Sequence, residues 1–385
     1  MGTLRDRVQN AMRALAKTRV YPDAAHSEPG YFRIPVCRNG KRYDLPLGFV
    51  GTQGCAWARE GGCTICDYGG YNGHVESDLL VQQASQLLDE WGPEHEIALS
   101  ALGSFFDDRE LAPDARKGII EAVRARQSID LFSVESRPDT ISRAKVREAV
   151  DILGPSITFE IGLGLESVND LVRNVCVNKG LTLSRFEESV RDILASGAKA
   201  CAHVLLKPPF LTEAEAIDDA VASINYADSI GVRRIVLMVC NVKDGTLPHW
   251  LWERGKYRSP WLWSALETVR KATPSAQRKL LVYGFKCGLP MFEMGHNCNQ
   301  CTGTILARLE DFCASQDPRV VEEAMQIVCE CKAEWRKDIE TPCEMSLPER
   351  VAGFCDEFEA EVLAGVGRNS PIFGDSVDGD ASSLS

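Results

Sequence analysis

Three cysteines fall within twelve residues in the segment GCAWAREGGCTIC at 54–66, at positions Cys55, Cys63 and Cys66. Iron–sulfur clusters normally take four cysteine thiolates, so three close thiolates indicate a cluster with one iron open to an exchangeable ligand. Two alternatives are a structural zinc with His74 as its fourth ligand, and three unrelated buried thiols. Zinc sites usually pair their cysteines as two close doublets, whereas this motif is a singlet followed by a doublet.

A second group of cysteines lies at Cys287, Cys298 and Cys301. This spacing indicates a second metal centre, either an auxiliary iron–sulfur cluster or a closed zinc site with His296 as the fourth ligand. Cys313 and the pair Cys329 and Cys331 are further candidate ligands, although the pair lies in a helical stretch where packing is the favoured role. The other cysteines are expected to pack in the core or along helices, as for Cys176, Cys201, Cys240, Cys343 and Cys355.

The 385 residues include fifteen cysteines and carry a formal net charge of −12. The average composition excludes a wholly disordered or fibrous chain. A disulfide-dense secreted domain would be shorter and would begin with a signal peptide, and the first twenty residues have no apolar core of signal length. No stretch approaches the ~18 uninterrupted apolar residues of a membrane span. We therefore expect a cytoplasmic protein with reduced thiols and no membrane contact.

The elements that must position these cysteines alternate along the chain. Strands are predicted at Leu47–Gly51, Ile97–Leu102, Leu131–Val134, Ile157–Ile161, Ala200–Leu206 and Arg234–Val239. Helices are predicted over 78–90, 112–127, 139–153, 182–197, 212–230 and 261–272. Short strands that alternate with longer helices predict βαβ units and a parallel sheet, and six units fit a βα barrel better than a doubly wound sheet.

Four parts are predicted along the chain. Residues 1–45 form an N-terminal helix and a lead-in loop, and residues 46–275 form the barrel. Residues 276–365 form a cysteine-containing region with one further strand over 279–285 and helices over 303–336 and 347–365. Residues 366–385 are polar and acidic and are predicted to be disordered.

Several segments outside the cysteine motif resemble the radical S-adenosylmethionine (SAM) superfamily. The similarity is to the branch shared by the elongator catalytic subunit and the radical SAM partner of archaeosine synthase, and it covers about residues 40 to 302. The similar segments are ALGSFFDDREL at 101–111, FSVESRPDTI at 132–141, FEIGLGLESVND at 159–170, VLLKPPFLTEAEAIDD at 204–219 and NVKDGTLPHWLWERGKYRSPWLWS at 241–264. The cysteine spacing x7/x2 departs from the commoner x3/x2. The resemblance implies an α/β fold, a partial (βα)6 radical SAM barrel with a mainly helical C-terminal extension.

The resemblance also implies a definite chemistry. A [4Fe-4S] cluster on Cys55, Cys63 and Cys66 would bind the amino and carboxylate groups of SAM. One electron, from a donor of the flavodoxin or ferredoxin type, would cleave SAM to methionine and a 5′-deoxyadenosyl radical that abstracts a substrate hydrogen. The protein must then supply a barrel mouth that excludes water and aligns the substrate.

Candidate ligands for SAM and substrate follow from the barrel, because barrel sites form at the carboxyl ends of strands. The candidates for SAM are Gly103, Ser104, Glu135, Arg137, Glu160 and Asn241, and those for substrate are His203 and Lys207. Glu135 and Arg137 suit the ribose hydroxyls and the SAM carboxylate. The alternatives are an ordinary turn at 103–104, a surface ion pair at 135–137 and a core histidine at His203. No catalytic residue is identified from the sequence.

Three functions remain open at this point. The acidic charge argues against a broad nucleic-acid-binding face, so the first expectation is hydrogen abstraction from a small nucleoside-like or other metabolite. Sulfur insertion from an auxiliary iron–sulfur cluster is one reaction of this kind. The alternative is a tRNA base-modifying lyase that cleaves a lysine-bearing deazaguanine adduct to archaeosine, with a partner protein supplying RNA contacts. A cluster-bearing electron carrier is the third, but carriers do not need a barrel of about 250 residues.

Overall fold

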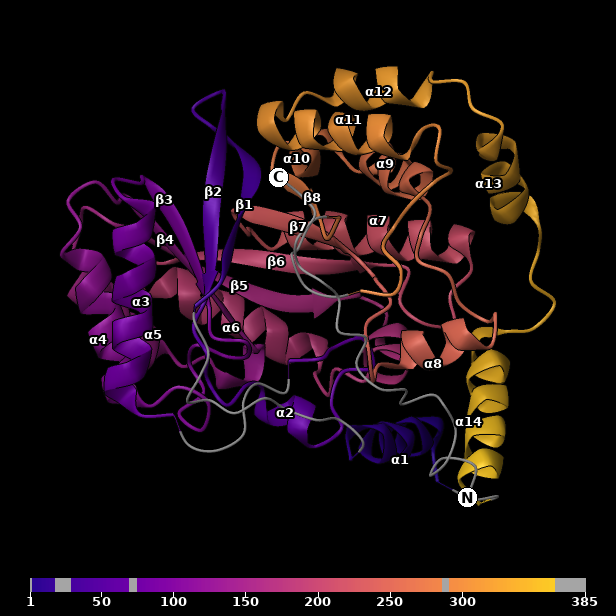
Figure 1. Cartoon of the computed structure of the whole chain (residues 1–385), viewed down its shortest axis with the longest axis horizontal. Coiled ribbons are helices and arrows are strands. Elements are labelled where there is room, and N and C mark those ends of the chain that lie inside the picture. The colour runs from indigo at the N-terminus through magenta and orange to yellow at the C-terminus, as the bar shows by residue number, and fades with distance from the viewer. Residues whose placement is uncertain (1, 18–28, 69–74, 286–290, 364–385) are drawn as a thin grey trace, which may run out of the picture.

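Eight strands form one sheet in chain order, β1 to β8, in the computed structural model, which describes residues 2–17, 29–68, 75–285 and 291–363 (Figure 1). Strands β2 to β8 are parallel to one another, and β1 is antiparallel to β2. The strands are β1 Tyr31–Arg38, β2 Lys41–Phe49, β3 Glu96–Ser100, β4 Leu131–Ser136, β5 Thr158–Glu166, β6 Lys199–Leu206, β7 Arg234–Val239 and β8 Leu280–Tyr283. The predicted parallel α/β sheet is confirmed.

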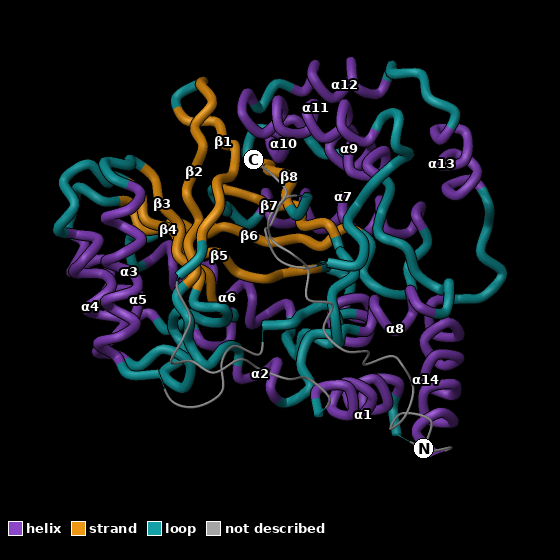
Figure 2. Tube along the Cα trace, in the orientation of Figure 1, coloured by secondary structure: helices purple, strands orange, loops and turns teal. Residues whose placement is uncertain are grey.

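Helices follow the strands along the chain and lie outside the sheet (Figure 2). The longer ones are α3 Ser77–Trp91, α4 Pro113–Arg124, α5 Arg143–Leu153, α6 Leu183–Ala195, α7 Glu213–Ser229 and α9 Leu262–Lys271, and the short ones are α2 Ala56–Arg59, α8 Leu247–Glu253 and α10 Pro274–Gln277. The C-terminal region is helical as predicted, with α11 Thr302–Ser315, α12 Pro318–Met325, α13 Cys331–Glu340 and α14 Leu347–Leu363. The predicted tail at 366–385 lies outside the described residues.

The sheet curves into a nearly closed barrel. Side chains alternate between the two faces of a strand, and one inward-facing residue from every strand reaches the same central cavity: Phe32, Leu45, Ala98, Ser133, Glu160, Cys201, Arg234 and Leu281. The rings of Phe32 in β1 and Tyr283 in β8 stack with their centroids 5.8 Å apart, so the two edges of the sheet approach each other. Helix α11 packs against β1, β2 and β8 and covers the remaining gap.

The hairpin β1–β2 corrects the prediction of a lead-in loop through residue 45. The two strands pair from Tyr31 opposite Gly48 to Arg38 opposite Lys41. Between them, Asn39 has φ 52° and Gly40 has φ 74°. Two successive left-handed residues are what a type I′ hairpin turn requires, and Asn-Gly is its preferred sequence. The Asn-Gly dipeptide is the one sequence feature that indicates this hairpin. The prolines and charged residues around it are typical of a loop and favoured that prediction instead.

The two ends of the described chain lie side by side, as helices α1 (Leu4–Ala16) and α14 (Figure 1). Thr3 and Asp6 form a capping box that starts α1. Arg7, on the basic face of α1, bonds Asp356 and Glu359 of α14 at 2.7 Å each. Ion pairs of Arg7 therefore join the first helix to α14. No helix in the described ranges is long and apolar enough to cross a membrane.

A network of charged side chains closes the barrel at the amino ends of its strands. Glu160 lies 2.6 Å from Arg233 and 3.3 Å from Arg234, and it accepts a hydrogen bond from Ser133 Oγ at 3.0 Å. Arg234 also lies 3.3 Å from Glu96. Burial opposes the charge of Glu160, but Arg234 and Arg233 outweigh it and the pKa of this carboxyl is lowered. The charged carboxylate is therefore part of what stabilises the fold.

We expect Glu160→Gln to lower the free energy of unfolding by roughly 3 kcal/mol, because it removes the buried carboxylate that Arg233 and Arg234 share. Arg234 would keep Glu96 as an acidic partner, whereas Arg233 would lose its ion pair. The lowered pKa means that this stabilisation is present above the ordinary carboxyl pKa near ~4.3 and is lost as the pH falls through the lowered value. Urea unfolding of both proteins at several pH values should therefore show the difference shrinking in acid.

The matched control is Glu361→Gln, which removes a partly exposed partner of Arg254. Its effect should stay within about 1 kcal/mol. A Glu160→Gln difference that is the same at every pH would contradict the assigned role of the charge.

Candidate active site

One cavity of about 300 Å³ collects most of the predicted site residues. This volume is within the range of small-molecule sites. The lining includes all three cysteines of the first motif, Cys55, Cys63 and Cys66, together with the inward-facing residues of the strands. The cysteine loop and the barrel interior therefore form a single site, as the barrel prediction required.

The three cysteines lie in the loop that follows β2 and contains α2. Burial raises the pKa of Cys55 to about 11 and that of Cys66 to about 12, so these thiols are protonated unless a metal binds them. The N–H of Tyr68 donates to Cys66 Sγ at 3.3 Å. Three soft donors on one cavity wall fit the predicted iron–sulfur cluster. His74, the alternative zinc ligand, lies outside the described residues.

Three cationic side chains line the same part of the cavity: Arg137, Lys179 and Lys243. Lys243 Nζ lies 2.9 Å from Asp67, the residue after Cys66. Burial works against the charge of Lys243, but Asp67 outweighs it and the pKa of Lys243 is raised. These cations would compensate the negative charge of thiolates that bind iron.

Arg137 and Lys179 belong together at the cavity wall. The Arg137 guanidinium donates to the carbonyl of Lys179 at 3.1 Å and lies 5.4 Å from the ring centroid of Trp57. Lys179 Nζ lies 2.7 Å from Glu166, the last residue of β5. Burial opposes both charges, but the pKa of Arg137 is raised by Cys63 and that of Lys179 by Glu166. Lys179 is a cavity residue that the sequence analysis missed.

The segment after the π-helical turn at Val172–Cys176 holds the cysteine loop in place. The carbonyl of Val177 accepts from Thr64 N–H at 2.9 Å, and Asn178 Nδ2 donates to the carbonyl of Gly62 at 2.8 Å. In return, Trp57 Nε1 donates to the carbonyl of Asn178 at 3.0 Å. Backbone groups of an irregular buried loop need such partners. Asn178 is thus a support of the loop, and no sequence motif marked it.

Gly103 and Ser104, predicted to contact SAM, lie against the cysteine loop. A Cβ on Gly103 would collide with the Glu110 carboxylate and lie 3.0 Å from Cys55 N, so a larger residue would displace that carboxylate or the cysteine loop. Gly103 lines the cavity, whereas Ser104 is fully buried and its Oγ accepts from Arg137 N–H at 3.2 Å. Ser104 therefore positions Arg137 rather than facing the cavity.

Glu110 is a further residue that the sequence analysis missed, although it lies in the segment 101–111. Its carboxylate accepts hydrogen bonds from Ala56 N–H at 2.7 Å and from Ser104 N–H. Burial raises the pKa of Glu110 to about 7, although both bonds oppose the shift. It joins the start of α2, next to Cys55, to the loop after β3.

Glu135 and His203 line the cavity from β4 and β6. The Glu135 carboxylate accepts from Ser100 Oγ at 3.1 Å and lies 3.9 Å from His203 Nδ1. His203 therefore faces the cavity rather than the core, and contact with the substrate stays a prediction for this residue.

Glu160 and Asn241 also line the cavity, but the structure gives them other tasks. Glu160 was expected at the exit of its strand, yet β5 continues to Glu166, so Glu160 lies at the amino end in the charge network. Asn241 Nδ2 donates to the carbonyl of Gly284 at 2.6 Å, and its Oδ1 accepts from Gly295 N–H at 3.2 Å. Both ends of the amide are used to join β7 to the segments that follow β8.

Lys207 was expected to contact the substrate, but it is not among the residues that line the cavity. Its Nζ lies 2.6 Å from Glu213, and both side chains are buried. Ser264 Oγ donates to the second oxygen of Glu213 at 2.6 Å. Lys207 is therefore part of a buried polar cluster that joins β6 to α7 and α9.

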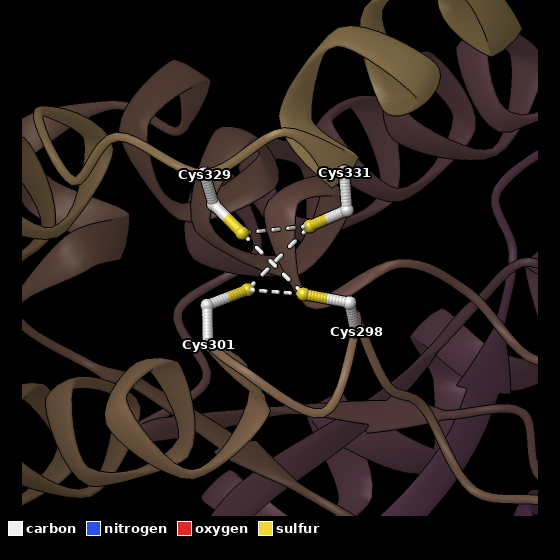
Figure 3. Close-up of side chains that lie close together, drawn as sticks. All are labelled: Cys298, Cys301, Cys329 and Cys331. Carbon is white, nitrogen blue, oxygen red and sulfur yellow. Dashed lines mark hydrogen bonds between the residues drawn. The ribbon is translucent and has the colours of Figure 1, made fainter.

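The second cysteine site has four members: Cys298, Cys301, Cys329 and Cys331 (Figure 3). Their sulfur atoms all lie within 4.8 Å of one another. Of the two roles that the sequence left open for Cys329 and Cys331, packing was favoured, but the structure places both in the cluster. The turn between α12 and α13 brings this pair to the doublet that starts α11, a contact that the sequence separation concealed.

The other candidate ligands do not join this site. His296 Nδ1 lies 2.9 Å from the carbonyl of Met294, and Cys313 Sγ bonds the backbone of Val282. Cys287 lies outside the described residues.

The spacing of the four sulfur atoms bears on whether the site suits a single ion or a four-iron cluster. Neighbouring sulfurs are 3.8 Å apart for Cys298 and Cys301, 3.4 Å for Cys298 and Cys329, and 3.5 Å for the two contacts of Cys331. Four thiolates about 2.3 Å from one tetrahedral ion would be about 3.8 Å apart. In a [4Fe-4S] cluster each thiolate binds its own iron, so the sulfurs must be further apart. The geometry fits a single ion.

We expect Glu110→Gln to loosen the cysteine loop, because an amide nitrogen cannot accept from the N–H it would face. The free energy of unfolding should fall by about 1–3 kcal/mol, and backbone amides at 55–66 should exchange hydrogen faster in mass spectrometry. The matched control is Glu121→Gln, an exposed acid on α4, which should leave this exchange unchanged. Equal exchange in Glu110→Gln and the wild type would show that Glu110 does not hold the loop.

Comparison with known proteins identifies relatives over most of the chain, although no protein-family model matches it. Archaeosine synthase subunit beta from Methanosarcina acetivorans is 33% identical over 298 residues, which cover 75% of this chain and 83% of the relative. Archaeosine synthase subunit beta from Thermococcus kodakarensis is 30% identical over 300 residues, 75% of this chain and 90% of the relative.

Two solved structures align with part of the chain at low identity. The archaeal Elp3 from Methanocaldococcus infernus, with its N-terminus deleted, has a TM-score of 0.45 at 17% identity and covers 61% of this chain and 59% of its own. Methylornithine synthase has a TM-score of 0.44 at 12% identity, covering 73% and 78%. On the extent of identity with the two curated relatives, the chain belongs to the radical SAM superfamily, in the family of archaeosine synthase subunit beta.

Proposed function

We propose that this chain is a radical SAM lyase that modifies a 7-deazaguanine-type nucleotide and works with a partner subunit. The observation that carries this proposal is the 33% identity that spans 83% of an archaeosine synthase subunit beta. The proposal thus favours the tRNA base-modifying lyase, which the sequence analysis gave as the alternative, over hydrogen abstraction from a small metabolite. The net charge of −12 is compatible with it if the partner subunit provides the contacts to RNA.

The residues of the cavity fit the cofactors that this chemistry needs. Cys55, Cys63 and Cys66 would hold a [4Fe-4S] cluster, which together with bound SAM supplies the 5′-deoxyadenosyl radical. The cations Arg137 and Lys179 lie beside the thiols, where they would stabilise negative charge on the cluster ligands. Gly103 lets the loop after β3 approach Cys55 closely.

Much of the cavity wall suits a reaction that must exclude water. Its walls carry apolar side chains from several strands, among them Phe32, Ile34, Leu47, Val236 and Met238. An apolar wall has no group that readily donates a proton, and it keeps solvent away from a reactive intermediate. The strands hold these residues rigidly, so a substrate group that enters the barrel meets a preformed surface.

We also propose that the second cysteine site holds one zinc ion with a structural role. Four thiolates close a tetrahedral site and leave no position for a substrate. Trp263 Nε1 contacts Cys331 Sγ at 3.5 Å, so the site is packed against α9. A closed single-ion site cannot donate sulfide, which is why a lyase is favoured here over a sulfur-inserting transferase.

The function is tested with anaerobically reconstituted protein, dithionite and SAM. We expect release of 5′-deoxyadenosine from the wild type and none from Cys63→Ala, because the cluster would lose a ligand. With the partner subunit and tRNA that carries the lysine-bearing deazaguanine adduct, mass spectrometry should show the adduct converted. Release of 5′-deoxyadenosine without conversion of any deazaguanine substrate would contradict the proposed substrate class.

The second site is tested by metal analysis. We expect about one zinc and about four irons per chain, with zinc lost in Cys329→Ser and retained in the control Cys343→Ser, which changes an exposed cysteine. The triple variant Cys55→Ala, Cys63→Ala, Cys66→Ala should lose the iron and keep the zinc. A triple variant that still binds about four irons would show an auxiliary cluster instead.

A further inference from the structure

Most charged side chains that line the cavity already have a protein partner. Glu166 pairs with Lys179, Lys243 pairs with Asp67, and the amide of Asn241 bonds backbone groups at both ends. At the amino end, Glu160 lies between Arg233 and Arg234. A paired group has little free energy left to gain from a ligand, so recognition must fall to the remaining polar atoms.

Glu135 and His203 differ from these pairs. Within the described part of the chain, no Lys or Arg pairs with Glu135, and its Oε1 has only His203 Nδ1 nearby, at 3.9 Å. This separation is too long for a direct hydrogen bond. The His203 imidazole has no hydrogen-bond partner among the described residues, and about a third of the Glu135 side chain (35%) is exposed to the cavity. A carboxylate oxygen and an imidazole nitrogen therefore face each other at the cavity without a hydrogen bond between them.

Gly162 makes room for the His203 imidazole at this position. It lies on β5 between the two side chains, and it pairs with Glu135 of β4 in the register of the sheet. A Cβ on Gly162 would lie 2.9 Å from His203 Nε2. The glycine therefore lets the imidazole extend across β5 towards the carboxylate of Glu135.

Glu135 and His203 lie deeper in the barrel than the cations that surround the thiols. Arg137 is two residues beyond Glu135 on the same inward face, closer to the carboxyl end and to the cysteine loop. The cavity thus has positive charge around the thiols and an unneutralised carboxylate one layer below. This order of charges suits a ligand with anionic groups at the mouth and a nitrogen cation below it.

We propose that Glu135 and His203 form a subsite that binds a protonated amine or amidine nitrogen of the substrate. A nitrogen cation that lies on the cavity side of both groups can donate one N–H to the Glu135 carboxylate and another to an unprotonated nitrogen of the imidazole. The subsite rests on the proposed function only in taking this cavity as the substrate site. It reassigns Glu135 from the SAM role expected from the sequence to the substrate.

The test measures binding to the full-length reconstituted protein without reductant, using two pairs of probes. The first pair is n-pentylammonium and its neutral counterpart n-pentanol. The second pair is 7-aminomethyl-7-deazaguanosine and 7-ethyl-7-deazaguanosine, which differ by an ammonium in place of a methyl group. We expect the wild type to prefer the cation in each pair by about tenfold or more, the size expected for a hydrogen bond to a charged group.

Three variants make the result specific. Glu135→Gln should abolish the preference for the cation while binding of the neutral probe stays the same. Glu135→Asp, which keeps the charge, should retain part of it, and His203→Gln should reduce it several-fold. Melting temperature and SAM affinity are measured alongside, so that a general loss of structure is recognised.

The outcomes separate the two proposals. Any one of three results would overturn the subsite. The wild type could bind n-pentylammonium no better than n-pentanol, or the preference for the cation could survive Glu135→Gln. The third such result is a Glu135→Gln defect that is confined to SAM affinity. A cation preference in the first pair with no binding of either deazaguanosine would support the subsite and contradict the proposed substrate class.

Discussion

The structure depends on one constraint: the irregular loop that carries Cys55, Cys63 and Cys66 is buried or half-buried along most of its length, so its backbone groups need partners from elsewhere. Glu110 provides acceptors, Val177 and Asn178 provide one acceptor and one donor, and helix α1 reaches the loop through Gln9, which donates to the carbonyl of Glu60 at 3.1 Å. The loop is thus fixed by segments spread over the first half of the chain. Its geometry is a property of the whole barrel rather than of the motif.

The total charge of the chain differs in sign from the cationic side chains that gather at its cavity. The chain is acidic overall, with 55 acidic and 43 basic residues, yet Arg137, Lys179 and Lys243 gather on one wall of the cavity. Each of these cations contacts a nearby acid, which is Asp139 for Arg137, Glu166 for Lys179 and Asp67 for Lys243. The net charge of a chain therefore says little about the sign of its site.

The regular elements could be predicted from sequence because hydrophobic periodicity reports them directly, and β7 was found with its bounds at Arg234 and Val239. The three cysteines at the cavity were found because their spacing is local. Two kinds of feature could not be predicted. The contact of Cys329 and Cys331 with Cys298 depends on how three helices fold back, and no periodicity records it. The amide of Asn241 and the ammonium of Lys207 turn to protein partners, and side-chain direction at a strand end is set by packing that only the structure shows.

The contact between α1 and α14 has a consequence for how the protein is made. Gly61 of the cysteine loop lies so close to α1 that a Cβ there would come within 2.5 Å of Arg13 N, and α1 is in turn bonded through Arg7 to residues 356 and 359. During synthesis, α14 leaves the ribosome more than 280 residues after Cys66. The cysteine loop therefore gains the support that α14 gives to α1 only after residues 347–363 have been made.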